Sequence, residues 1–180
     1  LDLEKLEEAV RLIIARHDSL RTAFRFDGME PIQVVHDAVY FRLKKIDLSA
    51  FPEEEKNERV KMITAEAKEA FDLELPPLLR VTVVKLKESE YMLLITMHHI
   101  ISDGWSLEIF KDELIKVYGS LVSGEEIMLE KPLQFGQVIS WLEGWMGTEK
   151  SKIQLDYWLN KLSGMEPLSL PKDFPGDKKR

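Results

Sequence analysis

Apolar residues recur at helical spacing in several stretches of the chain. Leu3, Leu6, Val10, Ile13 and His17 stand three or four residues apart, which places one stripe along a helix expected over residues 2–17. The same spacing predicts further helices over residues 107–121, 133–146 and 151–162. Another is expected to begin after Pro52, because proline lacks the amide hydrogen that a first helical turn leaves unpaired, and glutamates follow it.

Runs rich in β-branched and aromatic residues predict five strands. Residues 20–27 and 32–36 flank the turn dipeptide Asp27-Gly28 and predict a hairpin. A third strand is expected over residues 39–46. Residues 79–87 and 91–97 predict two more strands, and the last is apolar on both faces, as expected for a central strand covered by helices.

Composition narrows the class of protein. Apolar residues make up 44% and charged residues 32%, which is typical of globular proteins. The longest apolar run is far shorter than the roughly 20 residues of a membrane-spanning helix, and no signal peptide is evident, so we expect a cytoplasmic protein that does not bind membranes. The net charge of -7 argues against nucleic-acid binding. The absence of cysteine excludes disulfides and thiolate chemistry.

We expect one folded domain over residues 1–164 and a linker over residues 165–180. The linker is indicated by Pro167, Pro171, Pro175 and a polar tail. The sequence opens with Leu1 inside an expected helix, which predicts that the chain is an excerpt of a longer polypeptide.

The candidate chemistry lies at His98-His99, directly after the most apolar strand and before Asp103-Gly104. Loops at strand ends are where a rigid sheet presents reactive side chains, and Gly104 would permit a tight backbone path. Consecutive strand side chains point to opposite faces, so one histidine at most faces a given cleft. The same alternation argues against a shared metal ion, and we expect none.

Simpler interpretations of these residues remain open at this point. One or both imidazoles can be hydrogen-bonded core groups with no chemical role. Asp103 can be a helix N-cap that accepts from amides near Ser106, and Trp105 is more typical of a packing aromatic.

Four ordered segments resemble condensation domains of nonribosomal peptide synthetases, relatives of chloramphenicol acetyltransferase. Residues 97–106, M-H-H-I-I-S-D-G-W-S, resemble the H-H-x-x-x-D-G signature, and residues 16–24, R-H-D-S-L-R-T-A-F, resemble the R-H-E-x-L-R-T-x-F block. The segments F-D-L at 71–73 with P-L-L-R at 77–80, and Y-W at 157–158 with L-S-G at 162–164, match in order. Residues 134–138, Q-F-G-Q-V, depart from the family pattern, which leaves substrate contacts undetermined.

The resemblance implies an α/β fold, a mixed β-sheet with helices packed on one side, as in the N-terminal lobe of the chloramphenicol acetyltransferase-like fold. It implies that His99 is the active-site histidine and faces a channel between two lobes. Asp103 would hold the loop by pairing with an arginine, either Arg16 or Arg21, and the sequence does not choose between them. The residues expected to support the site are His98, Asp103, Gly104, Arg16 and Arg21.

The implied function is amide bond formation between carrier-bound acyl or aminoacyl thioesters. The fragment is expected to be inactive alone, because the C-terminal lobe is absent. No cofactor would bind directly, since phosphopantetheine belongs to partner carrier domains. Two alternatives are a coenzyme A-dependent acyltransferase and a non-catalytic lobe that docks carriers. Exposed apolar surface would also favour self-association.

Overall fold

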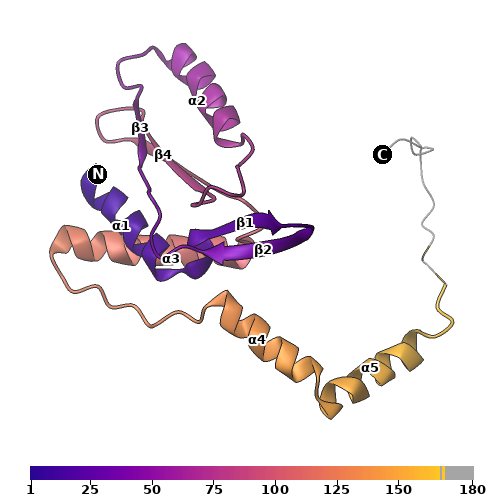
Figure 1. Cartoon of the computed structure of the whole chain (residues 1–180). Coiled ribbons are helices and arrows are strands. Elements are labelled where there is room, and N and C mark those ends of the chain that lie inside the picture. The colour runs from indigo at the N-terminus through magenta and orange to yellow at the C-terminus, as the bar shows by residue number, and fades with distance from the viewer. Residues whose placement is uncertain (167, 169–180) are drawn as a thin grey trace, which may run out of the picture. The chain divides into compact units, whose positions relative to one another are not determined.

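The computed structural model describes residues 1–166 and residue 168 (Figure 1). The chain divides into two compact units, Leu1–Phe135 and Gly136–Arg180. The predicted boundary between a domain over residues 1–164 and a linker over residues 165–180 remains a prediction. Most of that linker, including Pro167, Pro171 and Pro175, lies outside the described residues.

The first helix, α1, spans Leu3–Arg16, as its apolar spacing predicts. It begins at the Asp2 N-cap, whose side chain accepts hydrogen bonds from the amides of Glu4 and Lys5 at 3.1 Å each. These bonds satisfy amides that a first helical turn leaves unpaired. The helix ends at His17, and a short 3-10 helix, η1, follows at Asp18–Arg21. The buried stripe of α1 consists of Leu6, Ala9, Val10, Ile13 and Ile14.

The predicted hairpin is confirmed. Strands β1, Thr22–Asp27, and β2, Glu30–Val35, pair antiparallel and form a two-stranded sheet. Gly28 in the turn has a φ of 65°, a backbone conformation that glycine adopts without steric cost. Both ends of this hairpin lie close to η1, so the hairpin starts beside the end of α1.

A three-stranded mixed sheet contains β3, Lys44–Asp47, β4, Leu79–Lys85, and β5, Tyr91–Met97, in the order β3-β4-β5. β3 and β4 are parallel, whereas β4 and β5 are antiparallel. The expectation that residues 91–97 form a central strand is therefore wrong, because β4 has the two neighbours and Leu93 of β5 is 41% exposed. An apolar pattern on both faces indicates that other elements can cover a strand. It does not indicate whether the strand has a neighbouring strand along both edges. The expected strand over residues 39–46 is also shorter, since pairing begins at Lys44.

Helix α3, Gly104–Ser123, packs with α1 on the face of β4 that carries Leu79, Val81 and Val83. These strand residues share a core with the buried stripes of both helices. Helix α2, Glu53–Ala67, lies beside the opposite face, where Thr82 and Ile63 line one cleft. The expected mixed sheet is thus confirmed. Helices α1 and α3 pack on one face of it, as expected, whereas α2 lies on the opposite face. Strand alternation explains how β4 supplies both layers.

The α2 helix begins where Pro52 and the glutamates predict, with Pro52 as its N-cap. It ends at Ala67, so Phe71 lies beyond its end.

The second unit contains α5, Glu149–Leu162, and all but the first residue of α4, Phe135–Met146, and both helices are close to the predicted ranges. Thr148 caps α5 by accepting a hydrogen bond from the Ser151 amide at 3.3 Å. Neither of these two described helices contains a buried residue. Their exposed apolar side chains include Trp141, Leu142, Ile153, Leu155 and Trp158.

Among residues 1–166 and 168, no helix has both the length and the apolar character needed to cross a membrane.

Gly119 within α3 and Gly124 at its C-cap provide a matched test of how this helix ends. Gly124 ends the helix with a φ of 76°, whereas Gly119 is helical, and a Cβ added at either position would meet nothing within 4 Å. We expect Gly124→Ala to lower the free energy of unfolding by about 1 kcal/mol, because alanine disfavours the left-handed conformation. Gly119→Ala should raise it by about 0.5–1 kcal/mol. Urea denaturation measures both, and equal shifts would contradict the left-handed end of α3.

Candidate active site at the end of β5

The site begins where β5 ends and the chain turns into α3. The His98 amide donates to the Leu78 carbonyl at 3.0 Å and so extends the pairing of β4 and β5 by one residue. The His98 carbonyl accepts from the Ile101 amide at 3.1 Å and from the Ser102 hydroxyl at 3.1 Å. These bonds reverse the chain within four residues and fix the backbone of the histidine pair.

The two histidines differ in their surroundings. The half-buried His98 accepts a hydrogen bond at Nδ1 from the Ile100 amide at 3.0 Å. Because an amide can only donate, Nδ1 carries no proton and the neutral ring is protonated at Nε2. His99 is exposed, so its imidazole is not sealed in the core. The pair therefore combines one ring engaged by its own turn with one ring open to solvent.

Asp103 is the N-cap of α3 and forms a capping box with Ser106. Its carboxylate accepts from the Ser106 amide at 2.8 Å and from the Ser106 hydroxyl at 2.7 Å. The hydrogen bond from the Ser106 amide contributes most to holding the pKa of Asp103 below its usual range, and the hydrogen bond from the Ser106 hydroxyl comes next. The electrostatic interaction with His99 makes a smaller contribution in the same direction. The N-cap interpretation left open by the sequence is thus confirmed for Asp103.

The expected ion pair between Asp103 and an arginine is wrong. Arg16 contacts Glu113, with its Nε 3.0 Å from the carboxylate, and Arg21 contacts Asp18 at 2.6 Å. Within the described part of the chain, neither arginine pairs with Asp103. Arg21 pairs with a carboxylate three residues away, whereas the partner of Arg16 depends on how α1 and α3 pack.

Gly104 does not need to be glycine for the reason that the sequence suggested. It is the first residue of α3, its φ is outside the left-handed region, and an added Cβ would meet nothing within 4 Å. The tight path around the turn is made by the hydrogen bonds of His98 and Ser102 instead.

Sequence reasoning missed Glu113, whose carboxylate joins α3 to the end of α1. Its Oε1 accepts from Arg16 Nε at 3.0 Å, and its Oε2 is 2.7 Å from His17 Nε2. Glu113 is only 9% exposed, so these partners offset the cost of burying its charge. A signal was present, because position 113 lies on the apolar stripe of α3 between Phe110 and Val117. A carboxylate on such a stripe indicates a buried partner.

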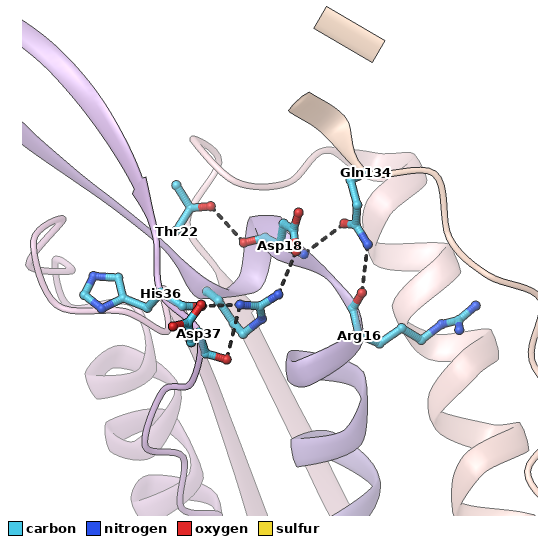
Figure 2. A network of polar contacts seen from close by, with 7 residues as sticks. Arg16, Asp18, Thr22, His36, Asp37 and Gln134 are labelled. Carbon is cyan, nitrogen blue, oxygen red and sulfur yellow. Dashed lines mark hydrogen bonds and ion pairs between the residues drawn. The ribbon is translucent and has the colours of Figure 1, made fainter. Parts of the chain in front are cut away.

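Gln134 is a second residue that was not singled out for this role. Figure 2 shows its side chain bridging the backbone at the end of α1. Oε1 accepts from the Asp18 amide at 3.0 Å, and Nε2 donates to the Arg16 carbonyl at 3.0 Å. The amide of this glutamine thus ties the segment before α4 to η1.

Arg21 ties the start of the hairpin to its end. Nη2 donates to the Asp18 carboxylate, and Nη1 donates to the carbonyls of His36 and Asp37. Arg16 and Arg21 are therefore both structural in their observed contacts, although their partners are not the one predicted.

A cleft of about 330 Å³ is lined by residues of α2, of β4 and of the segment that leads into β3. Its lining includes Arg42, Glu66 and Thr82 but neither histidine. The channel expected at His99 remains a prediction.

The family model described as Condensation domain matches residues 1–180. The chain is 39% identical over 178 residues to a linear gramicidin synthase polypeptide of Brevibacillus parabrevis, covering 97% of this chain and 2% of that protein. It is similar to the epimerization domain from the third module of tyrocidine synthetase B, with a TM-score of 0.87 and 23% identity, covering 98% of this chain and 40% of that one.

A second similar structure is the first condensation domain of the calcium-dependent antibiotic synthetase in complex with a substrate analogue. Its TM-score is 0.77 at 23% identity, with 94% of this chain and 41% of that chain covered. At this identity the two structural likenesses show the fold. The chain spans about two fifths of these solved chains and a much smaller share of the gramicidin synthase polypeptide.

Glu113 and Glu108 offer a matched pair of carboxylates on α3. Glu108 pairs with Lys111 at 2.6 Å, but their side chains are 61% and 43% exposed. We expect Glu113→Ala to lower the free energy of unfolding by roughly 2–4 kcal/mol, because Arg16 and His17 lose their buried partner. Glu108→Ala should change it by less than about 0.5 kcal/mol. Equal losses in urea denaturation would contradict the role of Glu113.

Asp103 predicts a dependence on pH. Its folded pKa is lowered below 3.8, so its charged form stabilises the fold above the unfolded pKa, and that stabilisation is lost as the pH falls through the folded pKa. Asp103→Asn keeps an N-cap acceptor but cannot ionise. We expect wild type to be more stable than Asp103→Asn near pH 6, and we expect the difference to shrink as the pH falls below 3.8 and through the lowered folded pKa. A constant difference in thermal unfolding across this range would contradict the assignment.

Proposed function

We propose a function from the premise that this chain belongs to the condensation domain family, whose model matches residues 1–180. The chain supplies the histidine-bearing part of a domain that forms amide bonds in nonribosomal peptide synthesis. One observation carries this proposal. In the segment that resembles the family signature, His99 is exposed at the end of β5 while its neighbour His98 is held within the turn.

The reaction joins two thioester-bound substrates. The amine of the acceptor attacks the carbonyl carbon of the donor thioester, a C–N bond forms, and the C–S bond breaks. The amine loses one proton, and the departing sulfur takes up a proton to leave as a thiol. The products are an amide on the acceptor and a free thiol on the donor carrier, so no oxidant or reductant is required.

We assign His99 to the proton at the attacking nitrogen. The neutral form of an imidazole can accept a proton and later return it. An α-amine with a pKa of about 7.7–8.0 is already partly neutral, so holding the nucleophile in place can contribute as much as removing its proton. An exposed ring on a fixed turn suits either role.

The proposed partners follow from the same chemistry. Carrier domains present both substrates on phosphopantetheine arms, so the chain needs to contact these arms without binding a cofactor of its own. The chain covers 41% of the solved condensation domain chain that it resembles. We propose that the remainder of such a domain forms the second wall of the channel at His99 and that this chain alone is inactive.

The test replaces His99 in a protein that joins this chain to the C-terminal part of a condensation domain. With donor and acceptor on carrier domains, we expect His99→Ala to lower the rate of amide formation by about 10²-fold or more, the usual contribution of a positioned acid or base. Mass spectrometry of the acceptor carrier measures the product. The matched control is His36→Ala, because His36 is also exposed but lies after β2, and this variant should keep the wild-type rate.

Three outcomes would contradict parts of the proposal. An unchanged rate in His99→Ala would remove His99 from catalysis. Acyl transfer from free coenzyme A without a carrier would indicate an acyltransferase acting on small molecules. Amide formation by residues 1–180 alone would show that the second wall is not needed.

A further inference from the structure

An aromatic ring from a distant part of the chain contacts the inner histidine. The rings of Phe71 and His98 have centroids 6.0 Å apart and lie perpendicular to each other. This is a favourable edge-to-face arrangement for two aromatic rings. Phe71 lies beyond the end of α2, so its side chain reaches the turn after β5 from the segment that leads into β4.

Arg80 holds the other partner of this contact. Its guanidinium carbon lies 3.8 Å from the centroid of the Phe71 ring. The same guanidinium donates to the carbonyls of Ala67 at 3.5 Å, Glu69 at 2.5 Å and Ala70 at 2.8 Å. Three carbonyls therefore fix the plane of the arginine, and the attraction of a cation for an aromatic face fixes the ring against it.

The backbone brings these groups together. Arg80 belongs to β4 and pairs in register with Thr96 of β5, two residues before His98. The His98 amide donates to the Leu78 carbonyl, two residues before Arg80. Arg80 and His98 are therefore connected twice, once through the backbone pairing of β4 and β5 and once through the side chain of Phe71. Each member is held by at least two independent contacts.

We propose that Phe71 and Arg80 are positioning residues for the histidine pair. The ring of Phe71 restrains the rotation of the His98 imidazole and keeps Nδ1 at the Ile100 amide. That bond closes the turn from which His99 projects. Loss of the ring would free the imidazole and leave the Ile100 amide without its acceptor. The relevance to catalysis rests on the proposed function of His99, but the restraint on His98 does not.

The test reads His98 directly in the 180-residue chain labelled with ¹⁵N. In wild type we expect the two ring nitrogens to have well-separated shifts, one typical of an unprotonated nitrogen and one of a protonated nitrogen. Loss of the signals in His98→Gln assigns them. In Phe71→Leu we expect the two shifts to move toward each other, because both tautomers become populated. Hydrogen exchange at the Ile100 amide should become about tenfold faster as its bond opens.

A second variant weakens the contact between Arg80 and Phe71 without removing the Phe71 ring. Arg80→Lys keeps the charge but loses the planar guanidinium and its fixed set of donors. We expect the same changes at His98 and Ile100, smaller than in Phe71→Leu. Phe71→Tyr retains the aromatic face and should give the wild-type pattern.

The matched control is a second cation–π pair in the same protein. Arg59 lies over the ring of Phe51 at 4.0 Å, and this pair makes no described contact with either residue of the histidine pair. Phe51→Leu and Arg59→Lys should leave the His98 nitrogens and Ile100 exchange unchanged. Far-UV circular dichroism establishes that each variant is folded.

Folded Phe71→Leu or Arg80→Lys protein with wild-type His98 shifts and Ile100 exchange would overturn the proposal. If Phe71→Leu does not fold, the result for Arg80→Lys decides. Equal changes in the Phe51 and Arg59 controls would also overturn it, because they would indicate general loosening. No substrate is present in these measurements, so failure here is distinct from failure of His99→Ala to affect amide formation.

Discussion

The meeting of α1 and α3 at the Glu113 carboxylate fixes the frame on which the candidate site is built. A carboxylate that is 9% exposed requires partners, and Arg16 and His17 supply them from the last turn of α1 and its C-cap. This pairing, together with the apolar core that the two helices share, holds α3 in register with α1. Since α3 begins at the Asp103 cap, the same contact also determines where the turn from β5 must end.

Within that frame, the turn separates two imidazoles that are adjacent in sequence. His98 is engaged on three sides, by the Leu78 carbonyl, the Ile100 amide and the Phe71 ring, whereas His99 is exposed. A reactive group is useful only when its position is fixed before substrate arrives. The division of the pair into an anchored residue and an open one meets this condition.

The features that were predictable from sequence are local ones. The stripe of α1, the Asp27-Gly28 turn and the Asp103 cap each depend on residues within a few positions of one another, and all three are present. The order of strands, the partner of Arg16 and the contact of Phe71 with His98 depend on packing between segments far apart. Arg16 illustrates the difference, because its segment was singled out correctly while its partner is 97 residues away. Glu113 could have been noticed as a charge on an apolar stripe, but nothing local identifies what pairs with it.

The distance in sequence between α1 and α3 has a consequence during synthesis. A ribosome adds roughly 5–20 residues per second, so α1 emerges several seconds before the helix that covers its apolar stripe has been made. Until then Val10 and Ile13, both fully enclosed in the finished fold, remain open to water or to a chaperone. The nascent chain therefore cannot fully bury the apolar stripe of α1 until the residues beyond the histidine pair have left the exit tunnel.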